Sequence, residues 1–149
     1  MLRINRQTDY AVRVVLSLSK RPAGLRVPTS EIQAEMLIPA AFLQRIVATL
    51  ANENFIVTQP GRDGGITLAR PPEAINLLQL VEAFEGPIWL SDCVEHLQSC
   101  VFGQTCPVNR RWARLRDVIR AELESATFAD LVNEANTIQH SILPIASTR

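Results

Sequence analysis

Apolar residues recur every three or four positions along several segments of the chain, and this spacing predicts a mainly helical protein. The first such segment covers residues 5–20, where Asn5 or Thr8 is suited to cap the first turn. Arg21-Pro22-Ala23-Gly24 follows and is expected to end the helix. The apolar stripe of this helix comprises Tyr10, Val14, Val15 and Leu18.

A short helix, a tight turn and a longer helix are predicted between residues 30 and 52. Ser30-Glu31-Ile32-Gln33 matches a capping box, which predicts the start of the short helix. Leu37-Ile38-Pro39 interrupts it, and the longer helix is expected from about Ala40 to Asn52. Its apolar stripe comprises Phe42, Leu43, Ile46, Val47 and Leu50. This succession is typical of a helix-turn-helix unit.

The next segment predicts a β-hairpin. Residues 54–59 form the first expected strand, residues 60–65 a glycine-rich turn, and residues 66–69 the returning strand. Such a hairpin after a helix-turn-helix is a wing, with Arg62 at its tip. A phosphate-binding loop is disfavoured because no Gly-Lys-Ser/Thr follows and the turn leads into a strand. An ordinary hairpin turn that binds nothing remains the alternative.

Two more long helices are expected further along. Residues 73–85 carry too many apolar residues for one exposed face, so this helix is expected to be buried on two sides. Residues 107–125 place apolar side chains every three or four positions, as dimerisation helices do; packing within one chain is the alternative. These side chains are Val108, Trp112, Leu115, Ile119 and Leu123.

The predicted fold is therefore mainly α with a small β-hairpin. A winged helix-turn-helix domain is expected at residues 1–72, and a connecting helix with a cysteine loop at residues 73–106. A dimerisation helix and a short terminal helix are expected at residues 107–136, and a flexible tail at residues 137–149.

The amino-acid composition indicates the class of protein and its expected cellular compartment. Hydrophobic residues make up 47% of the 149 residues and charged residues 20%, which is typical of a globular protein. No apolar run reaches the ~18 residues of a membrane span. No secretion signal is evident and the cysteine count is odd, so we expect a cytoplasmic protein without a disulfide framework.

The formal net charge is zero, but charge is unevenly distributed. Residues 1–70 carry nine basic and five acidic residues, a net of +4, whereas residues 71–105 carry five acidic and no basic ones, a net of −5. Lys20 is the single lysine, so the remaining basic residues are arginines, which suit bidentate phosphate contacts. The N-terminal segment is thus a candidate for binding nucleic acid, although a solvated arginine-rich surface has the same composition.

All three cysteines, Cys93, Cys100 and Cys106, fall within fourteen residues with the spacing C-x6-C-x5-C. An iron–sulfur cluster is the favoured interpretation, because a cluster is larger than one ion and accepts ligands from a wide loop. Structural zinc prefers closer pairs, even with His96 as a fourth ligand. A thiol–disulfide switch and unreactive thiols also remain open. No nucleophile–base pair is evident, so we expect no enzyme; a small iron–sulfur electron carrier is the alternative from another class.

Several stretches together carry a family resemblance. They are Thr8-Asp9-Tyr10-Ala11-Val12-Arg13, residues 38–50, residues 61–71, Val81-Glu82-Ala83-Phe84-Glu85-Gly86, the three cysteines followed by Pro107, and Thr127-Phe128-Ala129-Asp130-Leu131. Over nearly its full length the chain resembles the winged helix-turn-helix iron–sulfur repressors, which include the nitric-oxide sensor NsrR and the cluster-assembly regulator IscR. The NsrR-like branch is the more similar.

The resemblance implies a homodimer that binds a double-stranded DNA operator, with the long C-terminal helices crossing between subunits. It implies that Cys93, Cys100 and Cys106 bind the cluster, 4Fe–4S in preference to 2Fe–2S. IscR-like members have a histidine ligand where this chain has Asn109. NsrR-like members use an aspartate from the first helix of the other subunit, and Asp9 matches it. Asp9 is therefore the expected fourth ligand, and interaction with Arg13 or with the helix dipole is its alternative role.

The resemblance also implies a DNA-contacting set. Gln44 would contact a base, with adenine as its natural partner, while Arg45 and Arg62 would contact phosphate or a groove. The full set comprises Thr29, Ser30, Pro39, Ala40, Ala41, Gln44, Arg45, Gly61, Arg62 and Gly64. The expected function is a transcriptional repressor whose operator affinity depends on the cluster, with nitric oxide, oxygen or another redox change, or iron status, as the signal.

Overall fold

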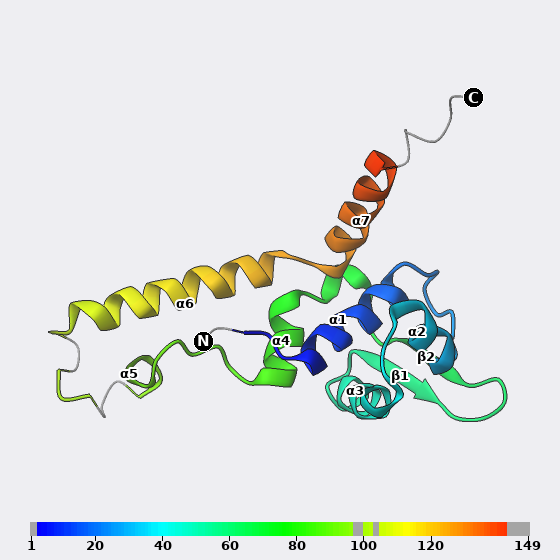
Figure 1. Cartoon of the computed structure of the whole chain (residues 1–149), viewed down its shortest axis with the longest axis horizontal. Coiled ribbons are helices and arrows are strands. Elements are labelled where there is room, and N and C mark those ends of the chain that lie inside the picture. Colours follow the sequence, from blue (N-terminus) through cyan, green and yellow to red (C-terminus); the bar gives the residue numbers. More distant parts are fainter. Residues whose placement is uncertain (1–2, 97–99, 103–104, 143–149) are drawn as a thin grey trace.

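The computed structural model describes residues 3–96, 100–102 and 105–142 (Figure 1). It is mainly helical with one β-hairpin, which confirms the predicted fold class. The elements in chain order are α1 (Arg6–Ser19), α2 (Thr29–Met36), α3 (Ala40–Asn52), β1 (Ile56–Gln59), β2 (Gly65–Leu68), the 3-10 helix η1 (Pro72–Ala74), α4 (Leu77–Glu85), α5 (Asp92–Glu95), α6 (Pro107–Ser125) and α7 (Phe128–Ile142).

Helix α1 lies at the centre of the hydrophobic core and packs against α2, α3, α4 and α7. All four residues of the predicted stripe are buried, Val14 and Val15 fully, and Ala11 is fully buried beside them. The side chain of Asn5 accepts a hydrogen bond from the backbone N–H of Thr8 at 2.9 Å, so Asn5 is the N-cap. The expected capping of this helix is confirmed.

Helices α2 and α3 form the helix-turn-helix, with an angle of 120° between them. The predicted capping box at Ser30 is wrong. The helix begins at Thr29, Pro28 is the N-cap, and no side chain caps it. The Pro28 carbonyl accepts hydrogen bonds from the N–H groups of Glu31 and Ile32, at 3.0 and 3.4 Å, so Ser30 already lies inside the first turn.

The wing is a two-stranded antiparallel sheet with Ile56 opposite Leu68 and Gln59 opposite Gly65. It is attached to the helix-turn-helix by Val27, just before α2. Val27 and Ile66 exchange two backbone hydrogen bonds of 2.9 Å each. The start of α2 and the wing are therefore held together by backbone pairing as well as by packing.

Helix α4 begins at Leu77, later than predicted, because the preceding backbone pairs with the chain ahead of α7. The N–H of Phe128 donates to the Ile75 carbonyl at 2.9 Å, and the N–H of Leu77 donates to the Ala126 carbonyl at 3.0 Å. Asn76 caps α4 through a capping box with Gln79. The helix packs between α1 and α6, which confirms its expected burial on two sides (Figure 1).

Helix α7 is longer than predicted: it extends to Ile142, past residue 137 where the flexible tail was expected. Hydroxyls of Thr137 and Ser141 donate to carbonyls one turn earlier, at 3.0 and 2.9 Å. Phe128, at the first position of α7, is fully buried and belongs to the same core as α1. The C-terminal helix thus completes the core of the winged-helix part.

Helix α6 has the predicted bounds and projects from this core, with its N-terminal end and α5 far from the winged helix (Figure 1). Much of its apolar stripe is exposed, since Val108, Trp112 and Leu115 each remain at least 40% accessible. Within the described ranges, no single helix is long and apolar enough to cross a membrane. The bent α2–α3 pair meets that test of length and composition only when its two helices are taken together.

Candidate DNA interface and cysteine centre

A groove of about 510 Å³ lies between the start of α2 and the wing. Five predicted DNA-contacting residues line it together, although they are about thirty positions apart in the sequence. They are Thr29, Ser30, Gly61, Arg62 and Gly64. Thr58 and Gln59 of β1 also line the groove and are exposed. Sequence reasoning missed these two residues because a short strand gives no sign of which neighbour it faces.

The remaining predicted contacts lie on α3 and the turn before it. Ala41, Gln44 and Arg45 are exposed on the outer face of α3, while Leu43 and Ile46 are buried against the core. Pro39 and Ala40, at the start of the helix, are exposed as well. An exposed helix face flanked by a wing and a second helix N-terminus is the geometry with which such domains enter a major groove.

Two adjacent glycines shape the wing turn. A Cβ at Gly64 would lie 2.2 Å from the carbonyl oxygen of Gln59, and a Cβ at Gly65 would lie 2.6 Å from that of Val27. Gly65 also has a positive φ of 153°. Glycine at position 64 therefore lets the hairpin turn close tightly on itself, and glycine at position 65 lets the wing approach the backbone just before α2.

The three cysteines lie on the segment that joins α4 to α6. All are free thiols and partly exposed. Cys93 belongs to α5, which packs against α6, and Cys106 is the N-cap residue of α6. Residues 97–99 and 103–104 of the segment lie outside the described part of the chain.

Cys93 has the best-defined surroundings of the three. Its sulfur lies 3.0 Å from the hydroxyl of Ser91, and the buried amide of Asn109 donates to the Cys93 carbonyl at 2.6 Å. Hydrogen bonding by Ser91, and then by the Asn109 side chain, lowers the pKa of the Cys93 thiol. Asn109 is the residue that the sequence analysis compared with the histidine ligand of IscR-like members. In this chain its side chain bonds to the backbone of Cys93.

A single chain does not assemble a metal site from the residues that the structure describes: they contain no group of three or more His, Cys, Asp or Glu side chains arranged to hold an ion. Free, partly exposed thiols nevertheless have the donor chemistry that an iron–sulfur cluster needs.

Asp9 lies in the first turn of α1 and forms an ion pair with Arg13, with 2.7 Å between Oδ2 and Nη2. The other terminal nitrogen of Arg13 donates to the Met36 carbonyl at 3.4 Å, at the end of α2. Arg13 also stands over the ring of Tyr10, which packs edge-to-face on Phe42 of α3. Asp9 is thus connected through one arginine to both helices of the helix-turn-helix.

Comparisons with known proteins agree with this architecture. The model of the Rrf2 family, described as iron-dependent transcriptional regulators, matches residues 4–134. The chain belongs to the Rrf2 family and is a transcriptional regulator. The regulator NsrR of Halalkalibacterium halodurans is 26% identical over 139 residues, which cover 93% of this chain and 95% of that protein.

Two solved structures are similar over most of their length. CymR, the global cysteine regulator of B. subtilis, is 25% identical with a TM-score of 0.75, covering 90% of this chain and 98% of CymR. IscR of T. potens is 20% identical with a TM-score of 0.74, covering 93% and 91%. The family match confirms the predicted family, and the description of that family as transcriptional regulators agrees with the class of protein that the sequence predicts.

Proposed function

We propose that this protein is a dimeric repressor whose affinity for operator DNA is set by an iron–sulfur cluster. The observation that carries the proposal is the placement of the three cysteines. They are free thiols on one segment that projects from a complete winged-helix domain. Cys93, Cys100 and Cys106 would hold the cluster, 4Fe–4S in preference to 2Fe–2S. When bound, the cluster would supply reactivity toward nitric oxide and oxygen.

The dimer is supported by the exposed stripe of α6. Val108, Trp112 and Leu115 give this helix a large apolar surface that one chain leaves open to water. A second α6 packed on this stripe would bury it. The same pairing would bring the projecting cysteine segment of one subunit toward the body of the other.

Asp9 is the proposed fourth ligand, supplied by the other subunit. Its carboxylate is half exposed and pairs with Arg13 within one chain, and exchange of an exposed ion-pair partner costs little. A change of partner at Asp9 alters the surroundings of Arg13, which also bonds to the Met36 carbonyl. The state of Asp9 would in this way bias the turn between α2 and α3.

The operator contacts follow from the groove and from the outer face of α3. We propose that Gln44 reads a base and that Arg45 and Arg62 contact phosphate or a groove. Thr29 and Ser30 would bind phosphate through their hydroxyls and through the free N–H groups at the start of α2.

A thiol switch on the same fold is the second candidate. It is favoured by Cys93, whose thiol is partly exposed and has a lowered pKa, as reactive cysteines do. In that case oxidation of the cysteines, without any metal, would change the affinity for DNA.

Anaerobic purification followed by iron and sulfide analysis separates these candidates. The cluster proposal predicts a coloured protein with absorption in the rough window of 300–450 nm, expected for thiolate-to-iron charge transfer. Titrated nitric oxide should remove this absorption. A colourless protein without iron or sulfide, whose DNA affinity changes with thiol oxidation, would establish the thiol switch instead.

A further inference from the structure

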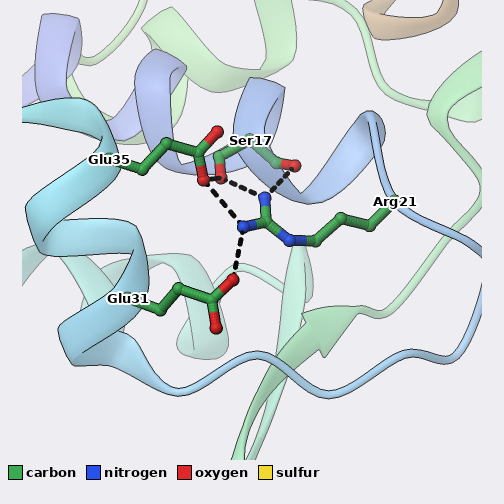
Figure 2. A network of polar contacts seen from close by, with 4 residues as sticks. All are labelled: Ser17, Arg21, Glu31 and Glu35. Carbon is green, nitrogen blue, oxygen red and sulfur yellow. Dashed lines mark hydrogen bonds and ion pairs between the residues drawn. The ribbon is translucent and has the colours of Figure 1, made fainter.

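Arg21 bonds to both α1 and α2. The DNA contacts proposed above do not use this residue. Its side chain is only 18% exposed. Nη1 donates to the carbonyl and to the hydroxyl of Ser17, at 2.8 and 2.7 Å. Nη2 donates to Glu31 at 2.8 Å and to Glu35 at 2.7 Å (Figure 2). One guanidinium therefore joins the end of α1 to two successive turns of α2.

The network closes on itself. Ser17 is fully buried, and its hydroxyl donates to Glu35 at 3.0 Å, so the serine and the arginine share one carboxylate. The hydrogen bonds that Arg21 donates to Glu31 and then to Glu35 raise the pKa of Arg21. Burial alone would raise the pKa of Glu35, but hydrogen bonds from Arg21 and Ser17 lower it. Each of these contacts is charge-assisted and hence stronger than a neutral hydrogen bond.

Helix α2 is also attached at its two ends, by the pairing of Val27 with Ile66 just before it and by the hydrogen bond from Arg13 to the Met36 carbonyl, but its buried face is small. It has eight residues, Ile32 is its one fully buried side chain, and no side chain caps its start. A helix this short is held in place by tertiary contacts and not by its own stability. Glu31 and Glu35 are four positions apart and lie on one face, so their bonds to Arg21 restrict both rotation and tilt of the helix.

The start of α2 is the part that faces the proposed DNA. Thr29 and Ser30 line the groove together with Arg62 of the wing. Glu31 is the next residue along, so the Arg21 contact is made within the same first turn. A rotation of α2 would therefore move both hydroxyls relative to the wing.

We propose that Arg21, with Glu31 and Glu35, is a positioning clamp that holds Thr29 and Ser30 in the geometry needed to contact DNA phosphates, without touching DNA itself. This inference rests on the proposed function, because it requires that the groove binds duplex DNA.

The test compares Arg21→Gln with Lys20→Gln, which removes the same charge from an exposed side chain one position earlier. The probe is a duplex selected from a random-sequence library by the wild-type protein, with binding measured by fluorescence anisotropy at several salt concentrations. We expect Arg21→Gln to weaken binding about 10-fold, or ~1.4 kcal/mol. Lys20→Gln should stay within about twofold. Arg21→Lys, which keeps the charge but not the planar fork, should restore part of the affinity.

The salt dependence separates positioning from contact. A clamp leaves the slope of log affinity against log salt unchanged in Arg21→Gln. A slope reduced by about one would mean that Arg21 itself neutralises a phosphate, and would overturn the proposal.

A double-mutant cycle supplies the second readout. Ser30→Ala should weaken binding in the wild-type background and have little effect once Arg21→Gln has released the helix. Additive effects would overturn the clamp.

If Arg21→Gln does not fold, Glu31→Gln replaces it, because that carboxylate is 56% exposed. Failure of the wild-type protein to select any duplex would overturn DNA binding itself, whereas full binding by folded Arg21→Gln overturns only the clamp.

Discussion

The winged-helix part and the cysteine segment differ in how much of their structure one chain supplies. In the winged helix, α1, α3, α4 and α7 bury their apolar side chains against one another, with Ile46 and Phe128 fully enclosed. In the cysteine segment, Val101 is 96% exposed and Phe102 71% exposed. The first region is a finished domain. The second leaves its thiols partly exposed and the side chains of Val101 and Phe102 open to solvent in the single chain.

The largest expected effect tests this contrast with one residue type in both regions. Phe128→Ala should destabilise the protein by about 3–5 kcal/mol, because it opens a cavity in the core. Phe102→Ala should change the stability of the cluster-free protein by less than ~0.5 kcal/mol, because the exposed ring makes few packing contacts that the substitution could remove. Urea unfolding measures both. Equal effects would mean that the cysteine segment is packed in the free chain.

Replacement of a proposed ligand should remove the cluster without changing the stability of the cluster-free protein. Cys106→Ala is expected to lose the iron and sulfide of the anaerobically purified protein. The thermal unfolding midpoint of the cluster-free form should stay close to that of the wild type, since the thiol lies outside the core. Retention of full iron content by the variant would exclude Cys106 as a ligand.

The sequence predicts some parts of the structure better than others. Where a segment packs within its own chain, periodicity was sufficient: the spacing of Val14, Val15 and Leu18 predicts the buried face of α1. Errors arose where distant backbone overrides local pattern. Residues 73–85 were predicted as one helix, but Ile75 and Asn76 are extended between η1 and α4. The Ile75 carbonyl pairs with the N–H of Phe128, which lies about fifty positions away.

The sequence was sufficient to predict which residue types form the candidate site, but not which side chains contact one another. Three cysteines in one loop indicate the chemistry without any structure. The contact of Asn109 with Cys93 and the clamp around Arg21 depend on distances between helices, which no spacing along the chain encodes.

Asp9→Asn tests the link between the two regions. The pair with Arg13 is exposed, so its loss should cost only about 0.3–0.5 kcal/mol of stability. If Asp9 is the ligand from the other subunit, the variant should nevertheless reduce the difference in DNA affinity between cluster-loaded and cluster-free protein. Glu134→Gln, an exposed acid on α7, is the matched control. An unchanged difference in affinity would assign Asp9 to its ion pair alone.

The smallest effect is a pH dependence within the winged helix. The pKa of Glu35 is lowered below its usual value of 4.5 in the folded protein. Its contribution to stability is therefore present above about that pH and is lost as the pH falls through the lowered pKa. Urea midpoints of the wild type and of Glu35→Gln should differ at pH 7 and converge in acid. A difference that grows in acid would reverse the sign of the inferred shift.

The most direct test of cluster control measures DNA affinity and cluster content in the same anaerobic sample. A labelled duplex selected by the cluster-loaded protein is titrated by anisotropy before and after stepwise addition of nitric oxide, while absorption is recorded. We predict that affinity falls in step with the cluster absorption, by a factor of about 5–150 as is typical of allosteric coupling. Undiminished affinity after the cluster absorption has disappeared would contradict the account.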